Sequence, residues 1–337
     1  MQKLKSQTFI HLSESILKLL SQNRIVTILD FLQEDVTKLA ALLKLNLPEV
    51  LAIRNEILNK YSAPLINGTI LLQKVLGGRR KISTGIESLD DATNGGILVG
   101  YITEICGLAE SGKTQLSLQL AINCVKVAER TVLYVDTKGD FSAVRVQKIL
   151  DAQGYSHKAM AAIMYKIRVV HVWTMDDLVE FFRSIKNKSL VVENLALIIV
   201  DSLPCLMLQY LGDENKISLS LLNTLVNYSR FIANELSIGI IYINIQTRWI
   251  DADTYEEEDD GESTSAIREH TYIEKRNRCL GRYWEQIPVL VLQLEKLEDY
   301  SKESNNFMQM KVFVLNSINM NSVNNECIVK LSGKMVL

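Results

Sequence analysis

The chain of 337 residues lacks any long hydrophobic run. A membrane-spanning helix needs about 20 consecutive apolar residues, whereas the apolar runs here, such as Leu195–Val200, have the length of a strand. No apolar stretch followed by a small-residue cleavage site occurs near the N-terminus, so we expect no secretory signal. These absences argue against a membrane protein, and we expect no membrane partner.

Paired cysteines and an excess of positive charge are also absent. Five cysteines are scattered along the chain without C-x-x-C spacing, which argues against a zinc site or a disulfide framework and favours a reducing compartment. Lysine and arginine number 37 against 39 aspartates and glutamates, a net charge of -2. This balance excludes nucleic-acid binding through bulk positive charge, although a local basic patch remains open.

Glycine is absent from the first 67 residues, which are rich in leucine, isoleucine and lysine. Such a segment predicts a small all-α domain over 1–60, with helices near 15–20, 25–33 and 36–43 and a last one beginning at Pro48. We interpret 61–80 as a linker, because Ala63–Gly68 breaks the helical pattern. Its basic end, Arg79–Lys81, is either solvated or a phosphate contact.

From residue 81 to 337, apolar runs of strand length alternate with helical periodicity. Continuous apolar strands separated by helices are typical of a mostly parallel sheet with helices on both faces. The last three expected strands lack intervening helices, so they predict an antiparallel C-terminal edge. The expected strands are 101–106, 131–136, 167–172, 195–201, 238–244, 288–294, 308–315 and 327–331.

One motif carries specific chemistry. The loop between the first expected strand and helix fits G-x-x-x-x-G-K-[ST], which predicts a phosphate-binding loop. Backbone N–H groups and the helix N-terminus would bind phosphate oxygens, and Lys113 would contact the β- and γ-phosphates. The alternative is an ordinary glycine-containing turn. The predicted nucleotide-binding residues are Gly107, Leu108, Ala109, Glu110, Ser111, Gly112, Lys113 and Thr114.

A magnesium ion normally accompanies a nucleotide in such a loop. The hydroxyl of Thr114 is the expected first protein ligand. Asp201 ends an apolar strand at the carboxyl edge of the expected sheet, where ligands of α/β proteins bind, and is the expected second ligand. An N-cap role for Asp201 is an alternative that does not exclude magnesium binding.

The residues around the loop resemble a known family. Four stretches before the loop, together with Gly112–Leu116 at its end and Val200–Ser202 further along the chain, resemble the RecA-type ATPase core of eukaryotic and archaeal recombinases. The chain is most similar to the eukaryotic recombinase paralogs, and within them to the D type. The four stretches are Ile82–Asp90, Gly95–Ile97, Gly100 and Thr103–Ile105; the D type is suggested by Tyr61–Gly68, Val132–Asp136 and Gly281–Trp284.

The resemblance covers nearly the whole chain and implies a RecA-like P-loop ATPase core that binds ATP and magnesium. It implies assembly with other recombinase paralogs into a heteromeric complex of homologous-recombination DNA repair. That complex would support recombinase loading on single-stranded DNA, with DNA contacted through the complex. It also implies a location in the nucleus.

The sequence departs from this family at the expected catalytic base. Active recombinases place a glutamate after Asp-Thr at the end of the second core strand, where it polarises the attacking water. Here that position is Lys138, which cannot accept a proton while charged. We therefore expect weak or no hydrolysis. The alternative is that Asp140, or a residue of a partner, completes the site.

Two further regions depart from the family. Asn244 and Gln246 alternate along an expected strand, so one of them is a candidate γ-phosphate sensor, although the family has an adjacent Asn-Gln pair. Residues 251–282 are expected to form a flexible loop that begins acidic and ends basic. Basic residues interleaved with tyrosines suit single-stranded DNA, although a solvated loop is the alternative. The candidate DNA contacts are Arg268, Lys275, Arg276, Arg278 and Arg282.

Three functions are consistent with these residues. The first is an ATP-binding paralog that acts as an adaptor in a heteromeric repair complex. The second is a DNA-stimulated ATPase that forms its own filament, which needs a working base. The third is a small-molecule P-loop kinase, which the residues at 84–90 and the helical N-terminal segment argue against.

Overall fold

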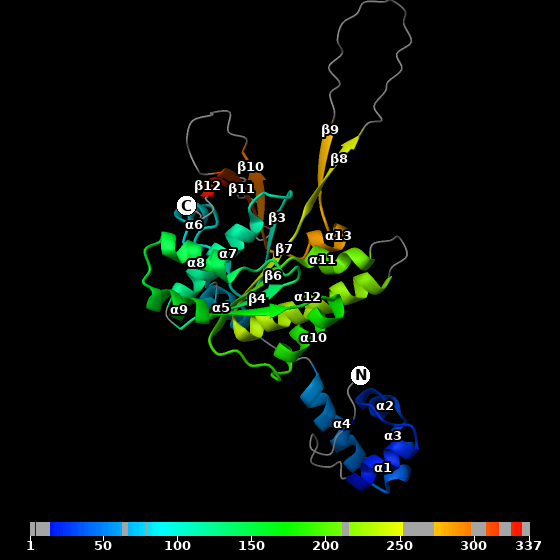
Figure 1. The fold of residues 1–337 in the computed structure, drawn as a ribbon. Coiled ribbons are helices and arrows are strands. Elements are labelled where there is room, and N and C mark those ends of the chain that lie inside the picture. Colours follow the sequence, from blue (N-terminus) through cyan, green and yellow to red (C-terminus); the bar gives the residue numbers. More distant parts are fainter. Residues whose placement is uncertain are drawn as a thin grey trace, which may run out of the picture. The chain divides into compact units, whose positions relative to one another are not determined.

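The computed structural model describes residues 4, 14–62, 67–78, 80–127, 129–210, 216–251, 273–297, 308–316 and 325–331. The chain divides into two compact units, Met1–Gly78 and Arg79–Leu337 (Figure 1). Across the described ranges, no helix combines the length and the apolar character that crossing a membrane requires.

The first unit is helical, as the glycine-free sequence predicts. Its helices are α1 (Glu14–Gln22), α2 (Ile28–Gln33), α3 (Val36–Leu43), α4 (Leu47–Tyr61) and α5 (Gly68–Gly78). Thr27 and Asn46 form capping boxes at the starts of α2 and α4. Phe31, Leu39 and Ile53 lie in a small buried core that helices α1 to α4 share.

The segment interpreted as a linker, 61–80, contains a helix of its own. Helix α5 occupies Gly68–Gly78, directly after the Ala63–Gly68 stretch that breaks the preceding helix. Residues 69–76 include three leucines and contain neither proline nor glycine, so they support a helix once the break has been passed. The division into a domain of 1–60, a linker of 61–80 and a core of 81–337 stays a prediction.

The second unit is built on a central sheet, which runs through the middle of that unit in Figure 1. Within the described residues it has eight strands in the order β12-β11-β10-β3-β7-β6-β4-β5. The six strands from β10 to β5 are parallel, whereas β11 and β12 form an antiparallel edge. The edge is therefore one strand narrower than expected, because β10 pairs in parallel with β3. The strands are β3 (Ile102–Gly107), β4 (Thr131–Asp136), β5 (Ile167–His171), β6 (Leu195–Asp201), β7 (Gly239–Ile243), β10 (Leu290–Lys296), β11 (Met308–Asn316) and β12 (Asn325–Leu331).

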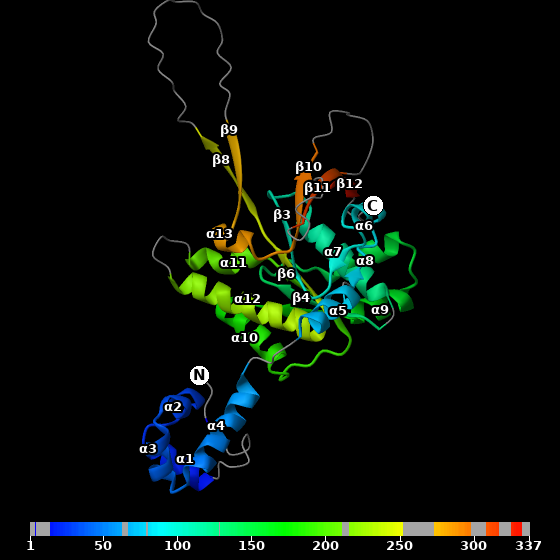
Figure 2. The same ribbon diagram turned by 180° about the vertical axis from the view of Figure 1, so that it is seen from behind.

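Helices cover both faces of this sheet (Figure 2). Alternate residues of β4 point to opposite faces, so Val132 and Tyr134 pack in one core and Leu133 and Val135 in the other. The first core includes helices α6, α7, α8 and α9, and the second includes α10, α11, α12 and α13. The helices are α6 (Glu87–Ala92), α7 (Lys113–Lys126), α8 (Ala143–Ala152), α9 (His157–Tyr165), α10 (Met175–Lys186), α11 (Leu203–Met207), α12 (Lys216–Leu236) and α13 (Gly281–Glu285).

Two small ribbons complete the unit. Strands β1 (Lys81–Ile82) and β2 (Ile97–Leu98) pair with each other. Strands β8 (Gln246–Asp251) and β9 (Ile273–Arg278) form an antiparallel ribbon that extends away from the central sheet in both views. The expected flexible loop over 251–282 is therefore wrong for 273–278, because this stretch pairs with β8, and α13 begins at Gly281. Residues 252–272, with most of the acidic tract, lie outside the described residues.

Candidate nucleotide-binding site

The predicted phosphate-binding loop joins the end of β3 to the start of α7. A Cβ atom at Gly107 would lie 2.5 Å from both Leu294 O and Ser111 Oγ, so this position admits only glycine. Gly112 has a φ of +87°, a left-handed conformation that favours glycine, and directly precedes α7. The first turn of α7 leaves N–H groups without acceptors in the helix, as an anion site requires. Glu110 is exposed, with a φ of +61°.

The ammonium group of Lys113 is buried against this loop. Its Nζ donates to Gly107 O at 3.0 Å, to Leu108 O and to Ser111 Oγ at 3.4 Å. Burial, and to a smaller extent the neighbouring Lys138 ammonium, lowers the pKa of Lys113 to about 8, against the opposing effect of Asp201. The hydrogen-bond acceptors of this cation are neutral dipoles of the loop, so a phosphate group would complement its charge.

Thr114 and Asp201 come from different elements and meet at the carboxyl edge of the sheet. Thr114 Oγ1, in the first turn of α7, donates to Asp201 Oδ2 at 2.8 Å. The hydroxyl of Tyr134 on β4 donates to the same oxygen at 2.9 Å. A hydroxyl and a carboxylate are the oxygen ligands that magnesium takes in P-loop proteins, so these residues fit the predicted ion and the loop fits the predicted ATP.

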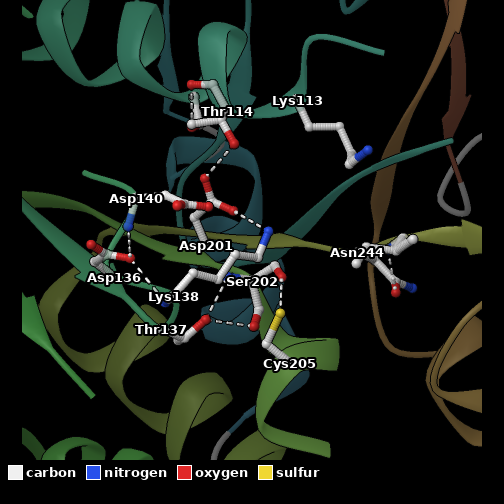
Figure 3. A network of polar contacts seen from close by, with 12 residues as sticks. Lys113, Thr114, Asp136, Thr137, Lys138, Asp140, Asp201, Ser202, Cys205 and Asn244 are labelled. Carbon is white, nitrogen blue, oxygen red and sulfur yellow. Dashed lines mark hydrogen bonds and ion pairs between the residues drawn. The ribbon is translucent and has the colours of Figure 1, made fainter. Parts of the chain in front are cut away.

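The other carboxylate oxygen of Asp201 faces a lysine. Asp201 Oδ1 is buried and accepts no hydrogen bond from the residues that the structure describes. Lys138 Nζ lies 3.7 Å from it, with the Asp201 side chain 5% exposed. Figure 3 shows Thr114, Asp201 and Lys138 in one chain of contacts, with the Lys113 ammonium turned away from Asp201. The residue at the expected position of a catalytic glutamate is therefore a cation paired with Asp201, the carboxylate that is expected to bind magnesium.

Asp136 organises the loop that carries Lys138. Its carboxylate accepts backbone hydrogen bonds from Lys138 at 3.0 Å, Gly139 at 2.9 Å, Asp140 at 3.3 Å and Phe141 at 2.9 Å. Burial raises the pKa of Asp136, but these four N–H groups more than offset it, so the pKa lies below its usual value. The loop after β4 is thus held in place by Asp136, the last residue of that strand.

Asp140, the predicted substitute for the missing base, is on the same loop. Its side chain is exposed and, within the described ranges, makes no hydrogen bond or ion pair, while its backbone N–H is bonded to Asp136. A proton-accepting role of Asp140 stays a prediction.

The two candidate sensor residues do not share a strand, contrary to expectation. Strand β7 ends at Ile243 and β8 begins at Gln246, so the chain turns between them. Asn244 is buried and donates to Glu104 Oε1 at 2.8 Å and to Cys279 O at 2.9 Å, while its Oδ1 accepts from Ile245 N. The Asn244 side-chain amide therefore already forms hydrogen bonds within the protein, which counts against a sensor role. Gln246 is buried at the start of β8.

The basic residues predicted to contact DNA divide into separate groups. Arg268 and the side chain of Lys275 lie outside the described residues. Arg276 pairs with Glu295 of β10. Arg278 points inward and donates to Glu104 Oε2 at 2.9 Å, which counts against a DNA contact. Arg282 is exposed on α13.

Sequence reasoning missed two buried polar residues beside the site. Tyr134 lies in a strand that its apolar run predicts, and a buried hydroxyl there predicts a polar partner. Glu104 is fully buried in β3, three residues before the loop, and burial raises the pKa of its carboxyl despite the nearby Arg278. A lone glutamate in an apolar strand is the signal that could have identified it.

Comparison with known proteins agrees with this geometry. Residues 79–263, more than half of the chain, match the Rad51 family. The chain is 27% identical to the DNA repair protein RAD51 homolog 4 of Bos taurus, over 85% of this chain and 83% of that protein. It is 29% identical to the Mus musculus protein of the same name, over 70% of this chain and 74% of the relative.

Archaeal proteins are similar as well. The DNA repair and recombination protein RadB of Thermococcus kodakarensis is 32% identical over 48% of this chain and 69% of its own length. The crystal structure of the RadB recombinase has the same fold, with a TM-score of 0.55 and 20% identity, covering 76% of this chain and 98% of that one. The chain belongs to the Rad51 family.

Proposed function

We propose that this chain is an ATP-binding recombinase paralog of the D type that acts within a heteromeric paralog complex in homologous-recombination DNA repair. One observation carries the proposal: the phosphate-binding and magnesium-binding residues are intact, but a lysine stands where the family has its catalytic glutamate. Similarity to the DNA repair protein RAD51 homolog 4 of cattle and mouse supports the D type. The complex would support recombinase loading on single-stranded DNA in the nucleus.

Each residue of the site has a defined role in this proposal. The backbone of Gly107–Gly112 and the ammonium of Lys113 bind the phosphates of ATP. Thr114 and Asp201 hold magnesium, which when bound neutralises phosphate charge. Tyr134 orients Asp201 by donating to its Oδ2 at 2.9 Å. Gln246 is the remaining sensor candidate, and Arg282 the exposed candidate for DNA.

The proposed chemistry is binding without efficient turnover. An ammonium group cannot take a proton from water, so Lys138 provides no general base. Its ammonium instead pairs with the Asp201 carboxylate, 3.7 Å away. ATP would then act as a ligand that stabilises the fold for assembly, and its removal would weaken binding to other paralogs.

Pull-down of recombinase paralogs by the full chain tests the adaptor role directly. We expect ATP to strengthen capture of at least one paralog by the wild-type chain and not by Lys113→Ala. Lys148→Ala is a matched control, since Lys148 is exposed on α8. Absence of any captured paralog, or formation of a filament by this chain alone on single-stranded DNA, would contradict the proposal.

A further inference from the structure

We propose that Lys138 is a tethered cation of the nucleotide site, which takes the place of much of the magnesium charge at Asp201 and makes ATP binding largely independent of magnesium. The inference rests on the proposed ATP-binding function and deepens it. It concerns the charge beside Asp201 Oδ1, the carboxylate oxygen that accepts no hydrogen bond from the described residues.

The two oxygens of Asp201 are used differently. Oδ2 accepts hydrogen bonds from Thr114 and Tyr134. Oδ1 is buried without a hydrogen bond from the described residues, and the ammonium of Lys138 is the cation beside it, at 3.7 Å. A buried carboxylate oxygen with no donor requires a nearby positive charge. Lys138 provides that charge from within the chain.

The backbone places Lys138 there. Thr137 N donates to Asp201 O at 3.0 Å. The Thr137 hydroxyl donates to Ser202 O at 2.8 Å and accepts from Ser202 N at 2.7 Å. The residue before Lys138 is therefore fastened to the residues at the end of β6.

The other side of the loop is fixed as well. Asp136 accepts four backbone N–H groups from the loop. His171 Nδ1 lies 3.5 Å from Asp136 Oδ2, and its ring stacks on Trp173, whose ring lies against Gly139. Hydrogen bonds therefore fix the backbone on both sides of Lys138, and this backbone places the Lys138 side chain beside Asp201.

The charge balance of the site then differs from that of a site with a glutamate at 138. Lys138 neutralises Asp201, and Lys113 remains as a second buried cation. With Lys138 removed, the negative Asp201 would repel the phosphates of metal-free ATP, and magnesium would be needed to bridge them. With Lys138 present, its charge screens this repulsion before any metal binds. The positive charge of the ammonium also repels magnesium and so lowers the affinity of magnesium for Asp201.

The test is a titration of the full-length chain with a fluorescent ATP analogue, in EDTA and across a series of magnesium concentrations. The measured quantity is the ratio of the affinity in saturating magnesium to the affinity in EDTA. For the wild type we expect a ratio below about threefold, and for Lys138→Met a ratio at least about tenfold larger, because a full charge at this separation is removed. Lys138→Arg, which keeps the charge, should resemble the wild type.

Lys148→Met is the matched control, because it removes one lysine charge from an exposed position of α8. Its ratio should equal that of the wild type. Binding of ATP with an equal magnesium dependence in the wild type and Lys138→Met would overturn the inference and leave the proposed function standing. A wild-type affinity for the analogue that falls by more than about threefold in EDTA would also overturn it. A chain that binds no nucleotide in any condition would overturn the proposed function, and this inference with it.

Discussion

Arg278 donates a 2.9 Å hydrogen bond to Glu104, a residue 174 positions earlier in the chain. Arg278 is the last residue of β9, and Glu104 lies in β3, which leads into the phosphate-binding loop. The Glu104 side chain is fully buried and the Arg278 side chain 20% exposed. This ion pair therefore fastens the base of the β8–β9 ribbon to the central strand of the nucleotide site.

Removing the arginine should destabilise the fold. Arg278→Gln leaves the buried Glu104 carboxylate without its cation, and breaking a buried pair in this way costs about 3–5 kcal/mol. We expect about 3 kcal/mol, at the lower end, because Arg278 retains some solvent contact. Urea unfolding of the full chain measures this loss.

Arg282→Gln is the matched control for that experiment. Arg282 is exposed on α13, four residues further along, so its substitution should change the unfolding free energy by no more than about 0.5 kcal/mol. Equal stability of Arg278→Gln and Arg282→Gln would show that the Arg278–Glu104 pair contributes little to the stability of the fold.

The buried carboxylate also predicts a pH dependence. Burial, partly opposed by Arg278, raises the pKa of Glu104 above the usual glutamate value of about 4.3. Between the unfolded and folded pKa values the folded chain binds the proton more tightly, so the contribution of Glu104 to stability falls as the pH rises through this window. Glu104→Gln abolishes this term. Its stability relative to the wild type should therefore increase from pH 4 upward, measured by urea unfolding; a constant difference would contradict the raised pKa.

Asp136 should be essential for the loop that carries Lys138. Asp136→Asn removes the charge that four backbone N–H groups share, and a hydrogen bond to a charged group contributes about 1.5–3 kcal/mol. We expect a loss of at least about 2 kcal/mol in the free energy of unfolding and faster amide hydrogen exchange over 137–141. Asp151→Asn, at an exposed position of α8, is the control. Unchanged exchange in that loop would refute the role of Asp136.

A glutamate at position 138 should restore turnover in part. A positioned general base typically contributes about 10²–10⁴-fold, and Lys138→Glu places a carboxylate on the loop where the family has one. We expect single-turnover ATP hydrolysis at least about tenfold faster than in the wild type. Lys138→Gln controls for loss of the lysine alone and should stay near the wild-type rate. A rate for Lys138→Glu no higher than for Lys138→Gln would mean that more than the base is missing.

Most of the core could be predicted from the sequence. The parallel strands of the central sheet are apolar runs, because both faces of a parallel sheet are buried. Each expected run corresponds to a strand. The phosphate-binding loop and Asp201 could be placed because a motif and a strand end fix their positions locally. Strand order could not be predicted, because adjacent strands such as β3 and β10 are separated in the sequence by most of the second unit.

The polar and paired residues were harder to foresee. Strand β8 carries polar residues on a ribbon outside the main core, so it lacks the alternation that marks a half-buried strand. Arg278 looked like a free basic residue because its partner lies 174 residues away. Lys138 could be recognised as a departure from the family, but its pairing with Asp201 depends on the register of β4 and β6, where Asp136 and Asp201 lie opposite each other.

The most direct test of the central claim is single-turnover hydrolysis of ATP by the pure chain, alone and with single-stranded DNA, beside a binding titration. The account predicts stoichiometric ATP binding that Lys113→Ala weakens by at least about tenfold, without turnover at the level of an active recombinase. Rapid hydrolysis that single-stranded DNA stimulates would contradict it, because Asp140 or another group would then serve as the base and the chain would be an enzyme in its own right.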